Sequence, residues 1–250
     1  MNKIIKNLEK KALELRRKTF LKFIEKKEAH LGGSFSMIEC LITLYYFFLK
    51  KNDKFILSKS HASFPLSILL RNKGYKPKLT THLEIDKKNG INCTTGSLGH
   101  GLPISTGIAF ARKVLKIKGR VVVMISDGEC QEGTTWESLL ISSKHNLNNL
   151  IVIVDYNKIQ ALSRIQDALP LKSLKKKFLA FNFECKEIRN GHSFLQLIKT
   201  FKNLKPKKPT VIIINTIKGK GIKEFENDPV WHARQLKEKD IMIGYKRLGI

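Results

Sequence analysis

Two runs of almost uninterrupted apolar residues, 121–125 and 150–155, give the strongest structural signal in the chain. Each has the length and the β-branched composition of a buried strand. Residues 135–145, between them, have the length and spacing of a helix. A strand, a helix and a second strand in this order form a βαβ unit. We therefore expect the two strands to lie parallel and to end at the same edge of a sheet.

The remaining apolar positions predict further alternation of helices and strands. Residues 2–28 read as one amphipathic helix, and a Gly-flanked loop around His30 separates it from a helix over 36–49, where Ser36 and Glu39 form a capping box. Short strands are predicted at 55–58, 183–188 and 210–215. This order predicts an α/β fold with three layers, α/β/α, and a mostly parallel central sheet. No Pro/Gly/Ser-rich linker divides the chain, so we expect a single domain over 1–250 with an N-terminal helical arm.

Polar residues directly after the two long strands suggest a metal site. Asp127 follows the first strand and Asn157 follows the second, so a carboxylate and an amide oxygen meet at one edge of the sheet. Such hard oxygen donors suit Mg²⁺, with the backbone carbonyl of Ile159 as a third ligand. Magnesium fills its other positions with water and phosphate oxygens, so the pattern predicts a phosphorylated cofactor, which Gly128 lets approach the backbone closely.

The formal charge of +26 raises the alternative of a nucleic-acid-binding protein. Lysines outnumber arginines, however, and they are scattered through the predicted helices with only short runs such as residues 175–177. No nucleic-acid-binding motif accompanies them. We therefore interpret the charge as a compositional excess of solvated lysines, with a residual field that would attract sugar phosphates or an acidic partner.

The cysteines and the apolar runs indicate where in the cell the protein is expected. Cys40, Cys93, Cys130 and Cys185 are far apart in the sequence and indicate neither a zinc site nor a disulfide framework. The longest apolar run, 41–49, is well short of the ~20 residues of a membrane helix. The N-terminus has no apolar signal core. These features favour the reducing cytoplasm and exclude a membrane protein.

The sequence around Asp127 resembles a motif of one enzyme family. The segment DGECQEGTTWES, which includes Glu132, followed by Asn157 at the end of the next strand, is similar to the metal and diphosphate motif of transketolases. The likeness is to their split form in particular, in which the diphosphate-binding (PP) domain is a separate N-terminal subunit. Ser126 stands where that family usually has glycine. The resemblance implies thiamine diphosphate and Mg²⁺ as cofactors, with Gly128, Glu132 and Asn157 at the diphosphate.

Further segments carry the same resemblance in the same order. HLGGSFS resembles the segment whose histidine faces the substrate, SKSHA resembles SKGHA with Ser60 in place of glycine, and TTHLEI resembles GHPE with Thr81 and Leu83 in place of glycine and proline. TTGSLGHG and TIKGKG...ENDPVWH resemble two further family segments, and NGHS resembles an architectural turn with His192. Lys218 and Lys220 are interpreted as solvated loop charges. The resemblance implies cofactor contacts by Gly96, Leu98, His61 and His232, and a catalytic cluster of His30, His61, His82, His100 and His232.

The implied activity is that of a transferase. A transketolase moves a two-carbon ketol unit between ketose and aldose sugar phosphates, and histidines around the cofactor suit general acid–base work near neutral pH. The glutamate that activates the cofactor belongs to a separate pyrimidine-binding domain in this family. We therefore expect a C-terminal partner subunit that supplies it, in an α2β2 assembly. Two alternatives remain open: a related enzyme of unusual-sugar or secondary-metabolite synthesis, and a cofactor-binding subunit without catalytic activity.

Overall fold

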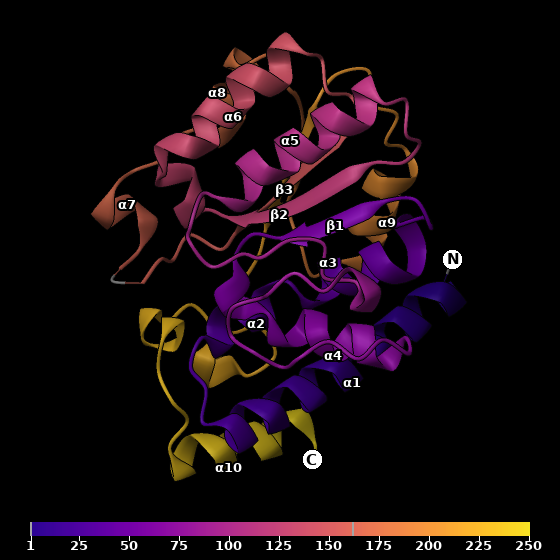
Figure 1. The fold of residues 1–250 in the computed structure, drawn as a ribbon. Coiled ribbons are helices and arrows are strands. Elements are labelled where there is room, and N and C mark those ends of the chain that lie inside the picture. Colours follow the sequence, from indigo (N-terminus) through magenta and orange to yellow (C-terminus); the bar gives the residue numbers. More distant parts are fainter. Residues whose placement is uncertain (1, 162) are drawn as a thin grey trace.

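A parallel sheet forms the centre of the molecule (Figure 1). The computed structural model describes residues 2–161 and 163–250. In this part of the chain the sheet has five strands in the order β1-β2-β3-β5-β4, and every neighbouring pair is parallel. The strands are β1 (Lys54–Leu57), β2 (Val121–Ser126), β3 (Leu150–Tyr156), β4 (Glu184–Ile188) and β5 (Thr210–Asn215). The predicted parallel pairing of the two long apolar runs is confirmed.

Helices cover both faces of this sheet (Figure 1). One face is covered by α5 (Gly101–Val114), α6 (Gly133–Lys144) and α8 (Leu174–Ala180), with the single turn α7 (Ile165–Ala168) near its edge. The other face is covered by α1 (Asn2–Lys26), α2 (Leu31–Ser36), α3 (Ile38–Thr43), α4 (Phe64–Asn72) and α9 (Phe194–Lys202). The last helix, α10 (Glu238–Leu248), packs against α1. No described helix is apolar over a length that could cross a bilayer.

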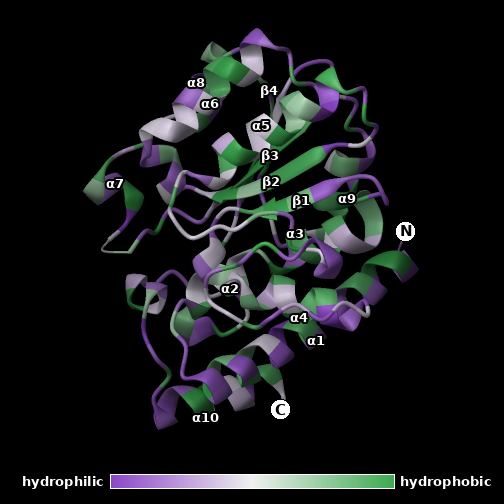
Figure 2. Cartoon of the chain, in the orientation of Figure 1, coloured by the Kyte–Doolittle hydropathy of each residue, from purple (hydrophilic) through white to green (hydrophobic). Residues whose placement is uncertain are grey.

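Alternate residues of each central strand enter different cores. Val122 and Met124 of β2 pack with the helices of the α1 side, whereas Val121, Val123 and Ile125 pack with α5, α6 and α8. Both faces of β2 are therefore dry, which explains why its sequence is continuously apolar rather than alternating. Figure 2 shows this apolar band through the middle of the molecule. The predicted three-layer α/β/α class is confirmed.

The region after α1 differs from the prediction. Residues 31–36 form the short helix α2 instead of a loop, and the predicted helix over 36–49 is divided into α3 and a π-helical turn, Leu44–Phe48. Gly32 lies within α2. A Cβ at this position would come within 2.6 Å of the Trp231 carbonyl oxygen, so the close packing of α2 requires a glycine here. The predicted capping box is wrong, because Ser36 donates its hydroxyl to Asp155 at 2.6 Å and Glu39 has other partners.

Glu39 is the centre of a buried ionic network. Its carboxylate accepts from Arg16 of α1 at 2.6 Å and from His192 Nδ1 at 2.9 Å. The other ring nitrogen of His192 accepts from the backbone N–H of Ile217 at 2.9 Å. Burial alone would raise the pKa of Glu39, but Arg16 and His192 reverse this effect and hold the pKa at about 2. The network thus joins α1 and α3 to the loop after β5, which agrees with the architectural role expected of His192.

The Glu39→Gln variant should lose stability that depends on pH. The folded pKa of about 2 lies below the ordinary value of 4.5, so the contribution of this carboxylate is complete above pH 4.5 and is lost as the pH falls towards 2. We expect the difference in unfolding free energy between wild type and Glu39→Gln to shrink by roughly 2–3 kcal/mol between pH 6 and pH 2.5. Urea titrations across this range measure it. Exposed Glu25→Gln is the control, and a constant difference for Glu39→Gln would contradict the assignment.

Candidate functional site

The ends of β2 and β3 bring the predicted metal ligands into one cavity. Ser126 pairs with Asp155 in the parallel register, so the residues that follow the two strands emerge side by side. Asp127 and Asn157 are both buried, and with Gly128 and Ile159 they line a cavity of about 110 Å³. The predicted meeting of a carboxylate and an amide at this edge is therefore present.

The oxygen atoms of these residues form a donor set that suits a divalent cation. The Asp127 carboxylate accepts from the N–H of Gly128 at 3.0 Å and from the N–H of Lys158, and Asn157 Oδ1 accepts from Ile159 N at 3.1 Å. Burial and the neighbouring Asp155 raise the pKa of Asp127 to about 7. A bound cation would offset this cost of burying the anion. Among the described residues no cluster of three His, Cys, Asp or Glu side chains could hold a metal.

Two buried lysines also line the cavity. Lys59 is 1% exposed, forms an ion pair with Asp155 and donates to the Gly33 carbonyl at 2.8 Å. Lys218 is 2% exposed and donates to the Ile159 carbonyl at 3.0 Å. The interpretation of Lys218 as a solvated loop charge is wrong. Burial, and then the charge of Lys59, lower its pKa to about 8, a cost that an anionic ligand would offset.

Three histidines gather beside these lysines. The ring centroids of His30, His61 and His232 lie 5.4–5.5 Å from one another. Burial, together with nearby cations, lowers the pKa of His61 well below its usual value and that of His232 to about 3, so both rings are neutral at pH 7. Lys218 Nζ lies 2.9 Å from His232 Nδ1 and donates to it, which leaves the ring proton on Nε2. Buried Nδ1 of His30 has no hydrogen-bond partner in the described part of the chain, as expected of a group that meets a ligand.

The other predicted histidines lie apart from this cluster. His82 is exposed and packs against Gly96, where a Cβ would come within 2.8 Å of its ring. Burial lowers the pKa of His30, and the nearby Glu28 opposes this effect in part. His100 lies at the start of α5, with Nδ1 3.0 Å from the Leu98 carbonyl, and it lines a separate apolar cavity between α5 and α6. Leu98 and Glu132, two of the predicted cofactor contacts, line the cavity that contains Asp127, whereas Gly96 packs against His82.

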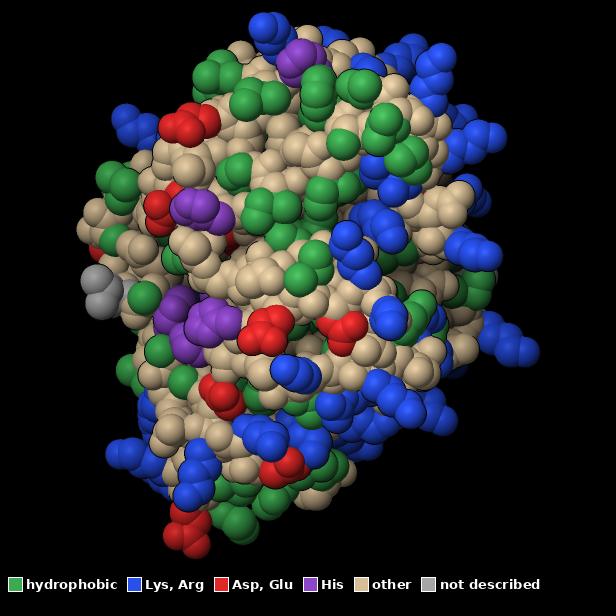
Figure 3. Space-filling model, viewed as in Figure 1, with side chains coloured by type: hydrophobic (Ala, Val, Ile, Leu, Met, Phe, Trp, Pro, Cys, Tyr) green, Lys and Arg blue, Asp and Glu red, His purple; other side chains and the backbone are tan. Residues whose placement is uncertain are grey.

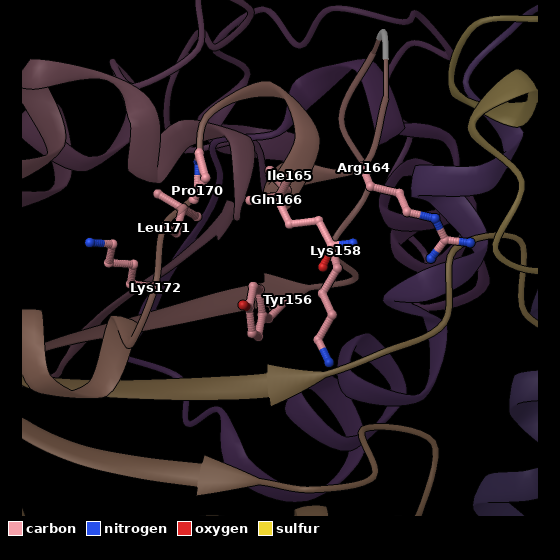
Figure 4. Close-up of a pocket in the computed structure, with 8 residues that line it drawn as sticks. All are labelled: Tyr156, Lys158, Arg164, Ile165, Gln166, Pro170, Leu171 and Lys172. Atoms are coloured by element: carbon pink, nitrogen blue, oxygen red, sulfur yellow. The ribbon is translucent and has the colours of Figure 1, made fainter.

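A second cavity lies at the loop after β3 (Figure 4). It measures about 280 Å³ and its lining includes Tyr156, Lys158, Arg164 and Lys172. The side chain of Lys158 lines this second cavity, with Nζ 5.5 Å from the Tyr156 ring centroid, and its backbone N–H donates to Asp127. The loop that follows the donor set is therefore basic on its outer side.

Comparison with known proteins assigns the chain to a family. Residues 9–250 match the family model described as transketolase, thiamine diphosphate binding domain.

The chain belongs to the transketolase family.

Relatives and solved structures agree with this assignment. The chain is 34% identical to one subunit of the apulose-4-phosphate transketolase of Actinobacillus succinogenes, over 96% of this chain and 95% of the relative. It is 33% identical to the 6-deoxy-6-sulfo-D-fructose transketolase subunit of a Clostridium species, over 84% of both. Among solved structures, transketolase from Campylobacter jejuni superposes with a TM-score of 0.87 and 26% identity over 98% of this chain, which spans only 43% of that protein.

These comparisons confirm several predictions. The transketolase family, the likeness to the N-terminal subunit of its split form, the transferase class and the thiamine diphosphate cofactor all follow from them. The structure fits that cofactor, because the cavity combines buried cations for a diphosphate with oxygen donors for a metal. A Cβ on Gly128 would meet no atom closer than 3.8 Å, so the glycine leaves open space where a phosphate can approach.

Sequence reasoning missed one carboxylate that holds the transketolase site together. Glu129 is fully buried and accepts from the backbone N–H groups of Ser126 at 2.8 Å and Gly99 at 3.1 Å, and from the Ser58 hydroxyl. These partners belong to three different segments that surround the cavity. The only signal in the sequence is its position two residues after Asp127, which does not reveal partners that are distant along the chain.

Three residues that differ from the usual transketolase motifs form hydrogen bonds with nearby groups. Leu83 replaces a proline and therefore has a backbone N–H, which donates to the Ser60 hydroxyl at 2.7 Å. Ser60 itself replaces a glycine, which could not accept this bond. Ser126 also replaces a glycine, and its hydroxyl accepts from the N–H of Glu129 at 3.3 Å. One hydrogen bond thus ties the segment that carries His82 to Ser60, and the other lies within the turn around Asp127.

Removing the Ser60 hydroxyl should destabilise the protein. Ser60→Ala leaves the buried N–H of Leu83 without its partner, so we expect a loss of about 1–2 kcal/mol in a urea titration. Ser67→Ala is the matched control, because the Ser67 hydroxyl is buried and has no partner among the described residues, and we expect it to be neutral. In a Leu83→Pro background, which lacks the N–H, Ser60→Ala should cost less. An equal cost in both backgrounds would rule out the pairing.

Proposed function

We propose that this chain is the N-terminal subunit of a two-subunit transketolase, a single thiamine diphosphate binding domain over residues 1–250. With Mg²⁺ and a partner subunit it transfers a two-carbon ketol unit between ketose and aldose sugar phosphates. The observation that carries this proposal is the shared cavity of Asp127, Asn157 and Ile159 with two buried lysines, in a chain that matches the cofactor-binding domain of the family.

The residues of the cavity divide into three roles. Asp127, Asn157 and the Ile159 carbonyl would hold the metal, which neutralises phosphate charge. Diphosphate binding is assigned to the Gly128 backbone, to Lys59 and Lys218, and to the other cavity residues predicted from the family, which are His61, Leu98, Glu132 and His232. Gly96 would act through the loop that it shares with Leu98. Thiamine diphosphate supplies the electron sink for cleavage of a carbon–carbon bond next to a carbonyl.

The histidines move protons on the sugar in this proposal. His30, His61 and His232 surround one point, and the low pKa values of His61 and His232 keep both rings neutral near pH 7, so that they can form hydrogen bonds with sugar hydroxyls without adding positive charge. The proton that Lys218 fixes on Nε2 of His232 makes that atom a hydrogen-bond donor. His82 and His100 are proposed at the outer part of the substrate path, because both are exposed.

The size of the cavity supports a partner subunit. Sites for molecules of cofactor size enclose about 300–1,000 Å³, so a cavity of about 110 Å³ has room for only a part of thiamine diphosphate. The remainder would lie against another protein surface. Two of the relatives named above are themselves called subunits of transketolases. We propose a C-terminal subunit that closes over the cofactor, supplies the activating glutamate and forms an α2β2 enzyme in the cytoplasm.

The relatives also favour a narrower candidate function. Both named subunits act, by their names, on unusual sugars, and they match over most of their own length, whereas human transketolase matches over only 31% of its length. A transketolase for a branched or sulfonated ketose is therefore the second candidate. A panel of ketose donors that includes common pentose phosphates, given to the assembled enzyme, distinguishes the two candidates by their kcat/KM values.

Asp127→Asn should abolish metal-dependent cofactor binding. Calorimetric titration with thiamine diphosphate and Mg²⁺ should show an affinity that is weaker by roughly 100-fold or more. The unliganded variant should be at least as stable as wild type. Burial raises the pKa of the Asp127 carboxyl to about 7, which shows that the buried anion is unfavourable, and a neutral amide does not have this cost. Exposed Asp167→Asn is the control and should bind normally. Unchanged binding by Asp127→Asn would refute the metal assignment.

Turnover should require the partner subunit. The purified chain alone is expected to show no measurable ketol transfer, because the small cavity leaves much of the cofactor uncovered and the activating glutamate lies outside this domain. Addition of the C-terminal subunit should restore turnover, with saturation at equal molar amounts. Full activity of the chain alone would overturn the assignment, and binding without turnover in the assembled complex would favour the non-catalytic alternative.

A further inference from the structure

A further cavity lies at the edge of the sheet where β1 begins, opposite the edge that carries the candidate site. It measures about 310 Å³. Its walls come from four parts of the chain: the π-helical turn with the loop after it, the start of β1, the end of α4 with the turn that follows, and residues 87–92. This cavity, which we call the β1 cavity, shares no lining residue with the cavity at Asp127.

The lining of the β1 cavity is strongly basic. Five of its residues are lysines, namely Lys50, Lys51, Lys54, Lys73 and Lys87. A lining of 13 residues would contain about two lysines or arginines at the average frequency of the chain, so the cavity concentrates positive charge beyond the general excess. Asp53 is the only acidic residue among the residues that line it.

Asp53 does not neutralise these lysines, because its carboxylate is bound elsewhere. It forms an ion pair with Arg120, and it accepts from the backbone N–H groups of Arg120 at 2.8 Å and Lys50 at 2.9 Å. Burial alone would raise the pKa of Asp53, but these bonds reverse the effect and lower it. In the part of the chain that the structure describes, no ion pair includes any of the five lysines.

Hydrogen bonds hold the segments that carry the lysines against one another. The backbone N–H of Lys76 donates to Asn89 Oδ1 at 2.8 Å, which joins the turn after α4 to residues 87–92. Asn92 Nδ2 donates to the Phe55 carbonyl at 3.0 Å, which joins the same residues to β1. Positive charges that surround one cavity repel each other, so this arrangement has an electrostatic cost that a bound anion would offset.

Aromatic rings also line the β1 cavity. Tyr45 belongs to the π-helical turn, a rare conformation that is frequent at functional sites, and its ring centroid lies 5.7 Å from that of Phe55. Burial, and then the nearby Tyr75, raise the pKa of the Tyr45 phenol, and its hydroxyl has no hydrogen-bond partner among the described residues. Tyr75 is 43% exposed, so its ring is accessible to a ligand.

We propose that the β1 cavity binds a nucleoside polyphosphate. Lysines bind phosphate groups as point charges, and five of them suit a ligand with more than one phosphate. The rings of Tyr45 and Tyr75 suit a planar base, which stacks on aromatic side chains. Small-molecule sites enclose about 300–1,000 Å³, so a cavity of about 310 Å³ fits one nucleotide better than a dinucleotide. The inference is independent of the proposed function, because the two cavities have no residue in common.

A nucleic acid is the alternative ligand for this basic surface. Figure 3 shows lysine and arginine side chains gathered on the right of the view, over the end of the sheet where β1 begins in Figure 1. A single strand is normally bound in a charged groove that follows several nucleotides. The β1 cavity is instead bounded by close packing, since a Cβ on Gly90 would come within 2.9 Å of Leu70. This geometry favours a ligand of one nucleotide.

Calorimetric titration of the full chain with ATP tests the proposal. The Lys51→Gln/Lys87→Gln variant should bind ATP about 10-fold or more weakly than wild type, because it removes two cations from the cavity lining. Lys239→Gln/Lys246→Gln on α10 removes the same charge at exposed positions outside the cavity, so it is the matched control and should bind as wild type does. No binding of ATP by wild type, or an equal loss in the two variants, would overturn the proposal.

Two further ligands test the nucleotide class. ATP should bind about 10-fold more tightly than inorganic tripolyphosphate, and Tyr75→Ala should remove most of this difference, because the base then has no accessible ring on which to stack. Equal affinities of wild type for ATP and tripolyphosphate, or tighter binding of a single-stranded RNA of about ten nucleotides, would overturn the assignment.

Thiamine diphosphate separates this proposal from the proposed function. With Mg²⁺ it should bind the Lys51→Gln/Lys87→Gln variant as it binds wild type, because neither lysine lines the cavity at Asp127. A variant that loses both ATP and thiamine diphosphate would indicate one shared site and would overturn the proposal. Wild type that binds ATP but no thiamine diphosphate would disprove only the proposed function.

Discussion

The buried carboxylate of Glu129 is the interaction on which the cofactor site depends. It accepts from two backbone N–H groups and two hydroxyls, which come from the end of β1, the loop before α5 and the end of β2. The sheet brings these segments to one edge, but it does not fix their loops relative to one another. A carboxylate with several acceptor positions can do so, since each buried N–H would otherwise be left unpaired. The Asp127 turn and the Gly99 loop are thereby held as one unit.

Electrostatic compensation determines what the cavity can bind. Lys59 and Asp155 are both buried and neutralise each other as an ion pair, supported by hydrogen bonds from Ser36 and Thr216 to Asp155. Asp127 and Lys218 are also buried but have no ionic partner at contact distance among the described residues, and the pKa of each is displaced towards its neutral form. A metal ion and a diphosphate would restore the charge of both groups. The site is therefore incomplete without its ligands, in the same way as metal sites whose ligands bury charge in advance of the ion.

Lysine is unevenly distributed over the surface of the molecule. Lysines cover the exposed sides of helices such as α1 and α8, where they remain solvated. Residues 101–111 of α5 contain none, although the average frequency of lysine and arginine would place about two there. The excess of lysine is therefore unevenly distributed over the surface.

The sequence by itself determined the strands at 121–125 and 150–155, their parallel pairing and the meeting of Asp127 with Asn157, because continuous apolar runs and the geometry of βαβ units are local properties. It also indicated His30, His61 and His232 through their motifs. Only the tertiary structure decided that Lys218 is buried, that Ser36 binds Asp155 instead of capping a helix, and that Glu129 joins three loops. Ser36 and Asp155 are separated by 119 positions, and Glu129 and Ser58 by 71. The partner of a buried polar group depends on which distant segments fold against it, and local periodicity contains no information about that choice.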